Sequence, residues 1–300
     1  MPRRTVNAIF KQIGLQLFLL AVTATVLFPI LWILSMALDP RNIDKPLTLT
    51  LIPPGASLAA FKRVLFEPFQ LLCSDPGDPS SCMTFGLLLK NSLIVALGTS
   101  VLAVLLGCTA AYAFSRFKFI GRKMGMLSFI ILMMLPTTAS LAPMYVLLSQ
   151  IHIGDETLRT TLFGLMIAYG AGTLPFAIWN LKGYFDTVPK ELEEAAWIDG
   201  CNISQTFFKI ILPLSVPALA VTVLFSFMTG WTEFILAWTL LEDPSRFTLA
   251  MALRSMQGQF ATPWSDFAAM SILMSLPIVG LFFLLQRYLI GGLTVGGVKG

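Results

Sequence analysis

Long apolar stretches with almost no charged residues fill most of this sequence, and they limit its possible folds more than any other feature. A bilayer core about 30 Å thick is crossed by roughly 20 residues of α-helix. Because 56% of the residues are hydrophobic and only 12% are charged, the composition departs from that of a soluble globular domain. The sequence therefore predicts an all-α integral membrane protein with six transmembrane helices. The predicted spans cover about residues 13–38, 91–115, 127–148, 160–181, 214–241 and 267–289.

The segments between these spans leave no room for a separate soluble domain. The longest is the segment at residues 39–90, and no internal repeat is visible. We therefore expect a single transmembrane domain over residues 1–300. The first apolar run is longer than the core of a signal peptide and no small-residue cleavage pattern follows it, so we expect it to stay in place as the first span.

Basic residues indicate how the spans are oriented. The short loop at residues 116–123 carries four basic residues and no acid, and short loops of this kind follow the positive-inside rule. With six spans, both termini then lie in the cytoplasm, residues 39–90 form an external loop, and residues 182–213 form a cytoplasmic loop. We therefore attribute the net charge of +4 to basic residues on the cytoplasmic side of the spans, and it does not indicate a nucleic-acid partner. The predicted location is the cytoplasmic (inner) membrane, where the spans contact lipid.

The four cysteines divide by their predicted side of the membrane. Cys73 and Cys82 lie in the external loop and flank the turn-rich segment SDPGDPSS. They either form a disulfide, which an oxidising exterior would permit, or remain free thiols. Cys108 and Cys201 fall in a span and in the cytoplasmic loop, where we expect reduced thiols that act as small apolar side chains.

Several kinds of chemistry have no counterpart in the sequence. The phosphate-binding motif GxxxxGK[ST] is absent, so the chain has no such loop with which to hold ATP. It has one histidine and no CxxC pair, which leaves no metal site and no nucleophile system to propose. We therefore predict no catalytic residue, no metal and no cofactor in this chain, and no enzymatic activity of its own.

A polar insert at Glu191–Pro213 interrupts the apolar runs between the fourth and fifth spans. Acids in its first turn suit a helix N-terminus, and Gly200 can adopt the positive φ that ends a helix. Ser204 is then a candidate cap for a second helix. The pattern predicts a helix, a sharp turn and a second helix. The insert either binds a soluble partner protein or is an amphipathic connector. One face of the first helix carries Leu192, Ala195, Ala196 and Asp199.

The insert resembles the EAA loop of ATP-binding-cassette importer permeases, EAA-x3-G-x9-I-x-LP. Asp199 also fits the common form of that loop, whereas Cys201 stands where alanine is usual. The resemblance implies that this segment couples the permease to a separate ATPase. The matching positions are Glu194, Ala195, Ala196, Gly200, Ile210, Leu212 and Pro213.

The resemblance extends to the MalG-type permeases of maltose importers through KGYFDTVPKELEEAAWIDG, LPLSVPALAV, WSDFAA and the ending QRYLIGGLTVGGVKG. It implies a MalF-like second permease, two copies of a MalK-like ATPase that carry the ATP and magnesium, and an extracytoplasmic sugar-binding protein. The implied activity is translocation of maltose, maltodextrin or a related oligosaccharide. Another sugar such as trehalose is the alternative.

The same resemblance assigns a role to the C-terminal tail. In this family the tail enters the ATPase dimer, which here would involve Gly296, Gly297 and Lys299. On residue pattern alone, five glycines between Gly291 and Gly300 predict only an extended chain end.

Glu233 is the one acid within a predicted span, and an intramembrane acid is a candidate functional residue. It either reaches water at the outer end of its span or lines an external cavity in which Trp231 stacks on a sugar. An ion-coupled secondary transporter is the alternative from another class. Such a protein would show related halves and several ionisable groups in the membrane, whereas this chain has one acid within its predicted spans and no visible repeat.

Overall fold

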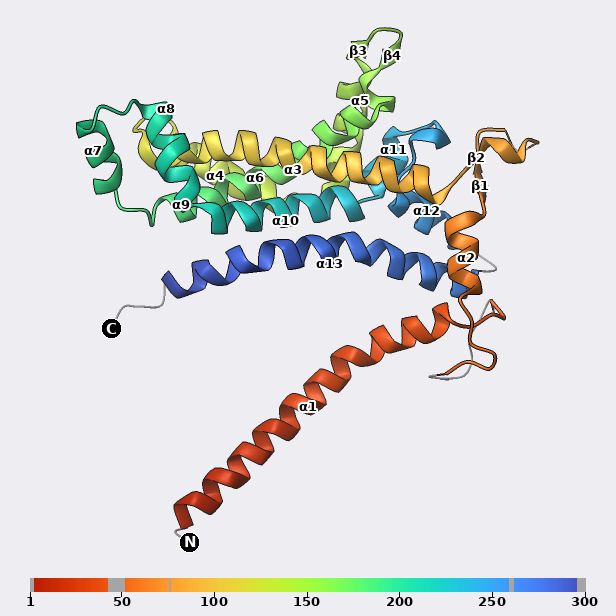
Figure 1. The fold of residues 1–300 in the computed structure, drawn as a ribbon. Coiled ribbons are helices and arrows are strands. Elements are labelled where there is room, and N and C mark those ends of the chain that lie inside the picture. The colour runs from red at the N-terminus through yellow and green to blue at the C-terminus, as the bar shows by residue number, and fades with distance from the viewer. Residues whose placement is uncertain (1–2, 43–51, 76, 259–261, 296–300) are drawn as a thin grey trace. The chain divides into compact units, whose positions relative to one another are not determined.

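The computed structural model describes residues 3–42, 52–75, 77–258 and 262–295 of the chain (Figure 1). Within these ranges, four helices are long and apolar enough to cross a membrane. This confirms the all-α membrane class. The four helices are α1 (Arg3–Ala37), α3 (Phe85–Arg116), α6 (Leu162–Phe185) and α13 (Trp264–Val295).

Two further candidate spans are bent pairs of helices. The first joins α4 (Arg122–Met134) to a segment made of the short 3-10 helix η2 (Thr137–Ser140) and α5 (Leu141–Ser149), with a bend of 103°. The second joins Ile203–Leu214 to α10 (Val216–Thr232), with a bend of 78°. The described residues therefore hold four to six candidate spans, and the count of six stays a prediction.

Two predicted spans are not continuous helices. The helix predicted at residues 127–148 stops at Leu135, which is extended with ψ of 133°, because a residue before a proline disfavours the α conformation and Pro136 has no N–H to donate. The helix predicted at residues 214–241 ends at Thr232, and α11 (Ile235–Leu240) begins after a two-residue break. Both predictions of an unbroken helix were wrong.

The chain divides into two compact units, residues 1–68 with 255–275 and residues 69–254 with 276–300. In the first unit, Arg63 of α2 (Ala59–Phe66) forms a 2.7 Å ion pair with Asp266 in the first turn of α13. The Asn42 side chain donates to the same carboxylate at 3.0 Å and accepts from the Ser265 backbone N–H at 3.1 Å. These contacts fix α2 to the start of α13.

In the second unit, α3 packs along both α6 and α10 (Figure 1). Gly230 allows α10 to approach α3 closely, since a Cβ at that position would lie 2.8 Å from the Cα of Ala96. Two buried apolar clusters result, one between α3, α6 and α11 and the other between α3, α6 and the insert. Short elements complete this unit: 3-10 helices η1 (Pro79–Ser81), η3 (Leu158–Thr160) and η5 (Pro244–Arg246), and α12 (Leu249–Ser255).

A two-stranded hairpin, β3 (His152–Ile153) and β4 (Glu156–Thr157), connects α5 to α6. Arg246 bonds it to the loop after α11 through a 2.5 Å ion pair with Glu156. The Arg246 guanidinium lowers the pKa of the Glu156 carboxyl through this hydrogen bond. Nearby, Arg159 forms a 2.7 Å ion pair with Glu242. The segments before α6 and after α11 are thereby held together.

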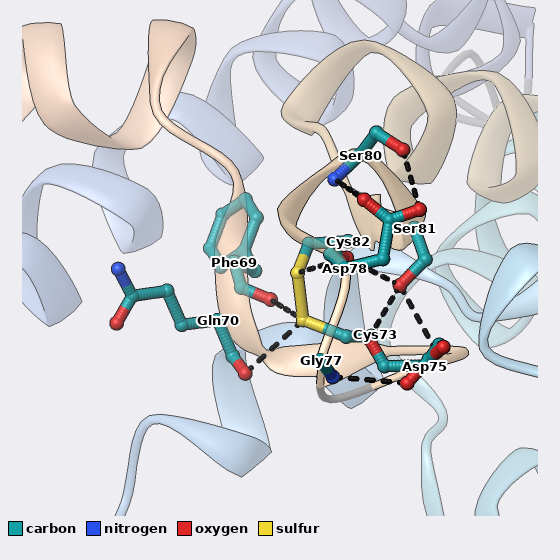
Figure 2. Close-up of a disulfide and its surroundings, with 9 residues drawn as sticks. All are labelled: Phe69, Gln70, Cys73, Asp75, Gly77, Asp78, Ser80, Ser81 and Cys82. Atoms are coloured by element: carbon teal, nitrogen blue, oxygen red, sulfur yellow. Dashed lines mark hydrogen bonds between the residues drawn. A yellow bond between two sulfur atoms is a disulfide. The ribbon is translucent and has the colours of Figure 1, made fainter.

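A second hairpin, β1 (Phe69–Cys73) and β2 (Cys82–Met83), precedes α3. A disulfide joins Cys73 to Cys82 across it (Figure 2). The intervening turn is held by its own polar groups: the Asp75 carboxylate accepts from the Gly77 N–H at 2.9 Å, and the Ser81 hydroxyl donates to the Asp75 carbonyl at 2.7 Å (Figure 2).

We expect this disulfide to be found in the purified protein. Alkylation under denaturing conditions without reductant should label only Cys108 and Cys201, the two free thiols, and mass mapping should recover a cross-linked peptide that contains Cys73 and Cys82. Reductant should make all four cysteines reactive. Full labelling of Cys73 and Cys82 before reduction would contradict the pairing.

Candidate functional site

The insert begins with the helix α7 (Glu191–Ile198), which carries three acids in its first turn where the helix dipole favours negative charge. The helix ends in a turn at Gly200, whose φ is +86°. Backbone bonds close that turn, because the Gly200 N–H donates to the Trp197 carbonyl at 3.1 Å and the Cys201 N–H donates to the Ala196 carbonyl at 2.9 Å. The chain direction therefore reverses at a residue with no side chain.

The second half of the insert starts with α8 (Ile203–Thr206), which Asn202 caps. The Asn202 side chain accepts from the Gln205 N–H at 2.8 Å, and the Gln205 side chain accepts from the Asn202 N–H at 2.9 Å, a reciprocal capping box. The prediction that Ser204 is the cap was wrong by two residues. A π-helical turn, η4 (Phe207–Ile211), and the short α9 (Leu212–Leu214) then lead to the bend before α10.

A buried ion pair fixes α7 to the end of α3. Glu193 is only 2% exposed, and its carboxylate pairs with the Arg116 guanidinium and accepts from the Tyr112 hydroxyl at 2.9 Å. The same guanidinium donates to the Val188 carbonyl at 3.0 Å. Because both charges are shielded from water and bonded on several sides, the pair positions the insert rigidly against a helix far away in the chain.

Polar contacts beside this pair extend the attachment. The Ser115 hydroxyl donates to the Asp186 carboxylate at 2.6 Å, and Lys182 forms an ion pair with the same carboxylate. Burial raises the pKa of the Asp186 carboxyl, but the bonds from Lys182 and Ser115 and the charge of Arg122 outweigh burial and lower it. Asp186 is therefore held in its charged form at the end of α6.

An aromatic cluster covers the ion pair on its apolar side. The Phe207 ring lies 4.8 Å from that of Tyr112 and 6.5 Å from that of Phe185, measured between centroids. Ile211 and Val188 belong to the same buried cluster. This packing excludes water, so the electrostatic attraction between Glu193 and Arg116 is screened less than at a surface.

The opposite face of the insert is exposed and apolar. Trp197 and Ile198 are 49% and 87% exposed, and Ile203 and Phe208 are more than half exposed. A shallow hollow is lined by Trp197, Cys201, Asn202, Ile203 and Ser204. An exposed patch of large apolar side chains with a polar surround is typical of a protein contact surface.

The residues predicted to couple the chain to an ATPase fall on both faces. Ala196 is buried beside Glu193, while Ile210 and Leu212 are half-buried. The remaining coupling residues are exposed: Glu194, Ala195, Asp199, Gly200 and Pro213. The predicted tail residues Gly296, Gly297 and Lys299 lie outside the described residues.

Of the two predicted substrate-path residues, Glu233 lines a cavity and Trp231 is buried in the helix packing. Glu233 sits at the break between α10 and α11, where its carboxylate accepts from the Ile235 N–H at 2.8 Å and the Leu236 N–H at 3.0 Å and so caps α11. It also lines a cavity of about 290 Å³. Trp231 is 1% exposed and stacks on Phe227 at 5.5 Å between ring centroids. The Trp231 ring offers no free face to a sugar, which differs from the alternative in which this ring stacks on the substrate.

Over the described ranges, no three His, Cys, Asp or Glu side chains come together in a way that could hold a metal ion. The charged groups at the base of the insert form ion pairs instead, Glu193 with Arg116 and Asp186 with Lys182.

We expect Glu193 and Arg116 to be strongly coupled in stability. Replacing either one alone with methionine should lower the free energy of unfolding by about 3–5 kcal/mol, because the remaining charge is left buried without its partner. The double replacement should cost less than the sum of the two. Thermal or denaturant unfolding of the detergent-solubilised protein measures this cycle, with Glu191→Met, an exposed site in the same helix, as the control. Additive costs would show that the pair contributes nothing.

Known proteins show where this chain belongs. Residues 103–294 match the family described as "Binding-protein-dependent transport system inner membrane component". The maltose/maltodextrin transport system permease protein MalG of Yersinia pestis is 36% identical over 295 residues, which cover 97% of this chain and 94% of that protein. The maltodextrin transport system permease protein MdxG of Bacillus subtilis is 41% identical over 215 residues, 70% of this chain and 74% of that protein.

A solved structure shows the same fold. The crystal structure of a bacterial ABC transporter involved in the import of the acidic polysaccharide alginate contains a chain that matches with a TM-score of 0.71 and 20% identity, over 96% of this chain and 98% of that one. Together with the family match and the identity to curated relatives, this likeness leads to one conclusion. The chain belongs to the family of binding-protein-dependent transport system inner membrane components.

Proposed function

We propose that this chain is the permease subunit of an ATP-binding-cassette importer for maltose, maltodextrin or a related oligosaccharide, and that an ATPase acts on it through the insert Glu191–Pro213. The observation that carries the proposal is the two-sided construction of α7. One side is anchored by the buried Glu193 pair, while the other presents exposed apolar side chains. The sugar class is inferred from the names of the relatives.

The proposal implies a set of partners. A binding-protein-dependent permease works with a second permease of the MalF kind, two copies of an ATPase of the MalK kind, and an extracytoplasmic sugar-binding protein. In this arrangement ATP and magnesium belong to the ATPase subunits. Both termini and the insert face the cytoplasm, and the tail residues Gly296, Gly297 and Lys299 reach the ATPase dimer.

The attachment of α7 explains how movement at the insert would reach the spans. The insert is joined by the chain itself to α6 on one side and to α10 on the other. The Glu193–Arg116 pair adds a third connection, to α3. Since α3 packs along both α6 and α10, a displacement of α7 by the ATPase would move the three helices together as one packed group.

A reconstitution experiment tests this function. In proteoliposomes that contain the two permeases and the ATPase, uptake of labelled maltose or maltodextrin should require ATP and the sugar-binding protein. Uptake driven by an ion gradient alone would contradict the proposal and favour a secondary transporter. ATP-dependent uptake of trehalose without maltose would keep the importer and change its substrate.

The same preparation tests the docking role of the insert. Gly200→Val forces a β-branched residue into a positive φ, at a cost of about 1–3 kcal/mol, and should reduce both co-purification of the ATPase and ATP-driven uptake at least tenfold. Gly154→Val is the matched control, since Gly154 has a φ of +64° and open space around it, in the β3–β4 turn. The control should retain the ATPase. Equal retention by both variants would contradict docking at the insert.

A further inference from the structure

The cavity beside Glu233 lies where two helix breaks meet. One break separates α4 from η2 at Leu135 and Pro136, and the other separates α10 from α11 at Glu233 and Phe234. Non-helical backbone at membrane depth is tolerated where it is buried in protein or lines a cavity, and broken helices form the substrate sites of several transporter folds. The cavity is lined by residues of η2, α5, α6, α10 and α11, and the break between the last two.

We propose that this cavity is a sugar-contact site of this chain and takes one ring of the transported oligosaccharide. The inference rests on the proposed import function and adds to it a place where this chain touches the substrate. The cavity volume of about 290 Å³ lies at the lower end of the range for small-molecule pockets. It therefore suits a single ring, and the rest of the oligosaccharide would contact other parts of the complex.

The cavity lies well inside the membrane-spanning part of the chain. Tyr169 and Phe176 follow the first residue of α6, Leu162, by 7 and 14 positions, which correspond to about 10 and 21 Å along the helix. On α10, Phe225 and Thr229 lie within the last two turns before the break. A ligand in this cavity would therefore be on the path across the membrane.

Hydrogen-bond acceptors with unused capacity converge on the cavity. The hydroxyls of Thr173 and Thr229 donate back to carbonyls of their own helices at 3.1 Å, so their oxygen lone pairs remain to accept from a sugar hydroxyl. The Tyr169 hydroxyl likewise donates to the Glu233 carbonyl at 3.1 Å. The Glu233 carboxylate is held in place by the first turn of α11, and its Oε2 atom accepts a long bond of 3.2 Å from the Leu236 N–H.

An aromatic pair supplies the apolar side of the site. Phe176 and Phe225 both line the cavity, with ring centroids 5.3 Å apart and planes inclined by 55°. The C–H face of a pyranose packs on such rings while its hydroxyls turn to the acceptors. A lipid acyl chain would also contact the rings, but it has no hydroxyl to donate to the remaining lone pairs of the carboxylate and of the threonine hydroxyls.

The test uses the complete complex in proteoliposomes, arrested with vanadate during ATP hydrolysis, with labelled maltose as the probe. Thr229→Val and Phe176→Leu should each lower the maltose retained per assembled complex about tenfold, which corresponds to about 1.4 kcal/mol. Their controls make the same changes outside the cavity. Thr109→Val removes an exposed hydroxyl with the same type of bond to its own helix, and Phe163→Leu alters an exposed ring on α6. Both controls should stay within twofold of wild type.

Three results would overturn the inference. The first is retention by Thr229→Val and Phe176→Leu that equals that of the controls. The second is loss of a co-purifying phospholipid from these variants with sugar retention unchanged, which would identify the occupant as an acyl chain. The third is a wild-type complex that takes up neither maltose nor another labelled oligosaccharide with ATP. That result would remove the proposed function itself, and it is distinguished from the first two because the unaltered protein fails.

Discussion

The buried ion pair between Glu193 and Arg116 is the interaction on which the arrangement of the insert depends. Transferring two charges from water into protein is costly, and the cost is offset only where each charge has several good partners. Here Tyr112 and the Val188 carbonyl supply them, and the ring of Phe207 helps to exclude water. The inner face of α7 is therefore firmly attached to α3. Under the proposed function, this attachment lets a partner that binds the outer face of α7 displace the spanning helices.

A second constraint is the pair of helix breaks that end α4 and α10. Pro136 and Glu233 each end a helix within an apolar run, one through a missing N–H and the other through a carboxylate that caps the next helix. Both breaks open onto the cavity that Tyr169 and Phe225 line. The packed group of α3, α6 and α10 thus extends from the insert to this cavity. The proposed function requires such a connection between the ATPase contact and the substrate path.

The features that depend on composition and local geometry were predictable from the sequence. Long apolar windows predicted spans at about residues 13–38 and 267–289, close to the observed Lys11–Ala37 and Trp264–Leu289. The positive φ at Gly200 followed from the residue type. The ion pair did not follow, because Glu193 and Arg116 lie 77 positions apart and periodicity does not reveal which face of α7 is buried. Glu193 and Ala196, three positions apart, form that face. The basic loop at residues 116–123, predicted on the same side of the membrane, was the one sequence feature that could have indicated a partner for Glu193.

The central claim is that the exposed face of α7 is where an ATPase grips this chain. The most direct measurement is photo-crosslinking in the assembled complex from a reactive residue at Ile198, which is 87% exposed, with Ile153 of the β3–β4 hairpin as the reference position. The account predicts an adduct with the ATPase from position 198 and none from position 153. Absence of an ATPase adduct from position 198, in a complex that still imports sugar with ATP, would contradict it.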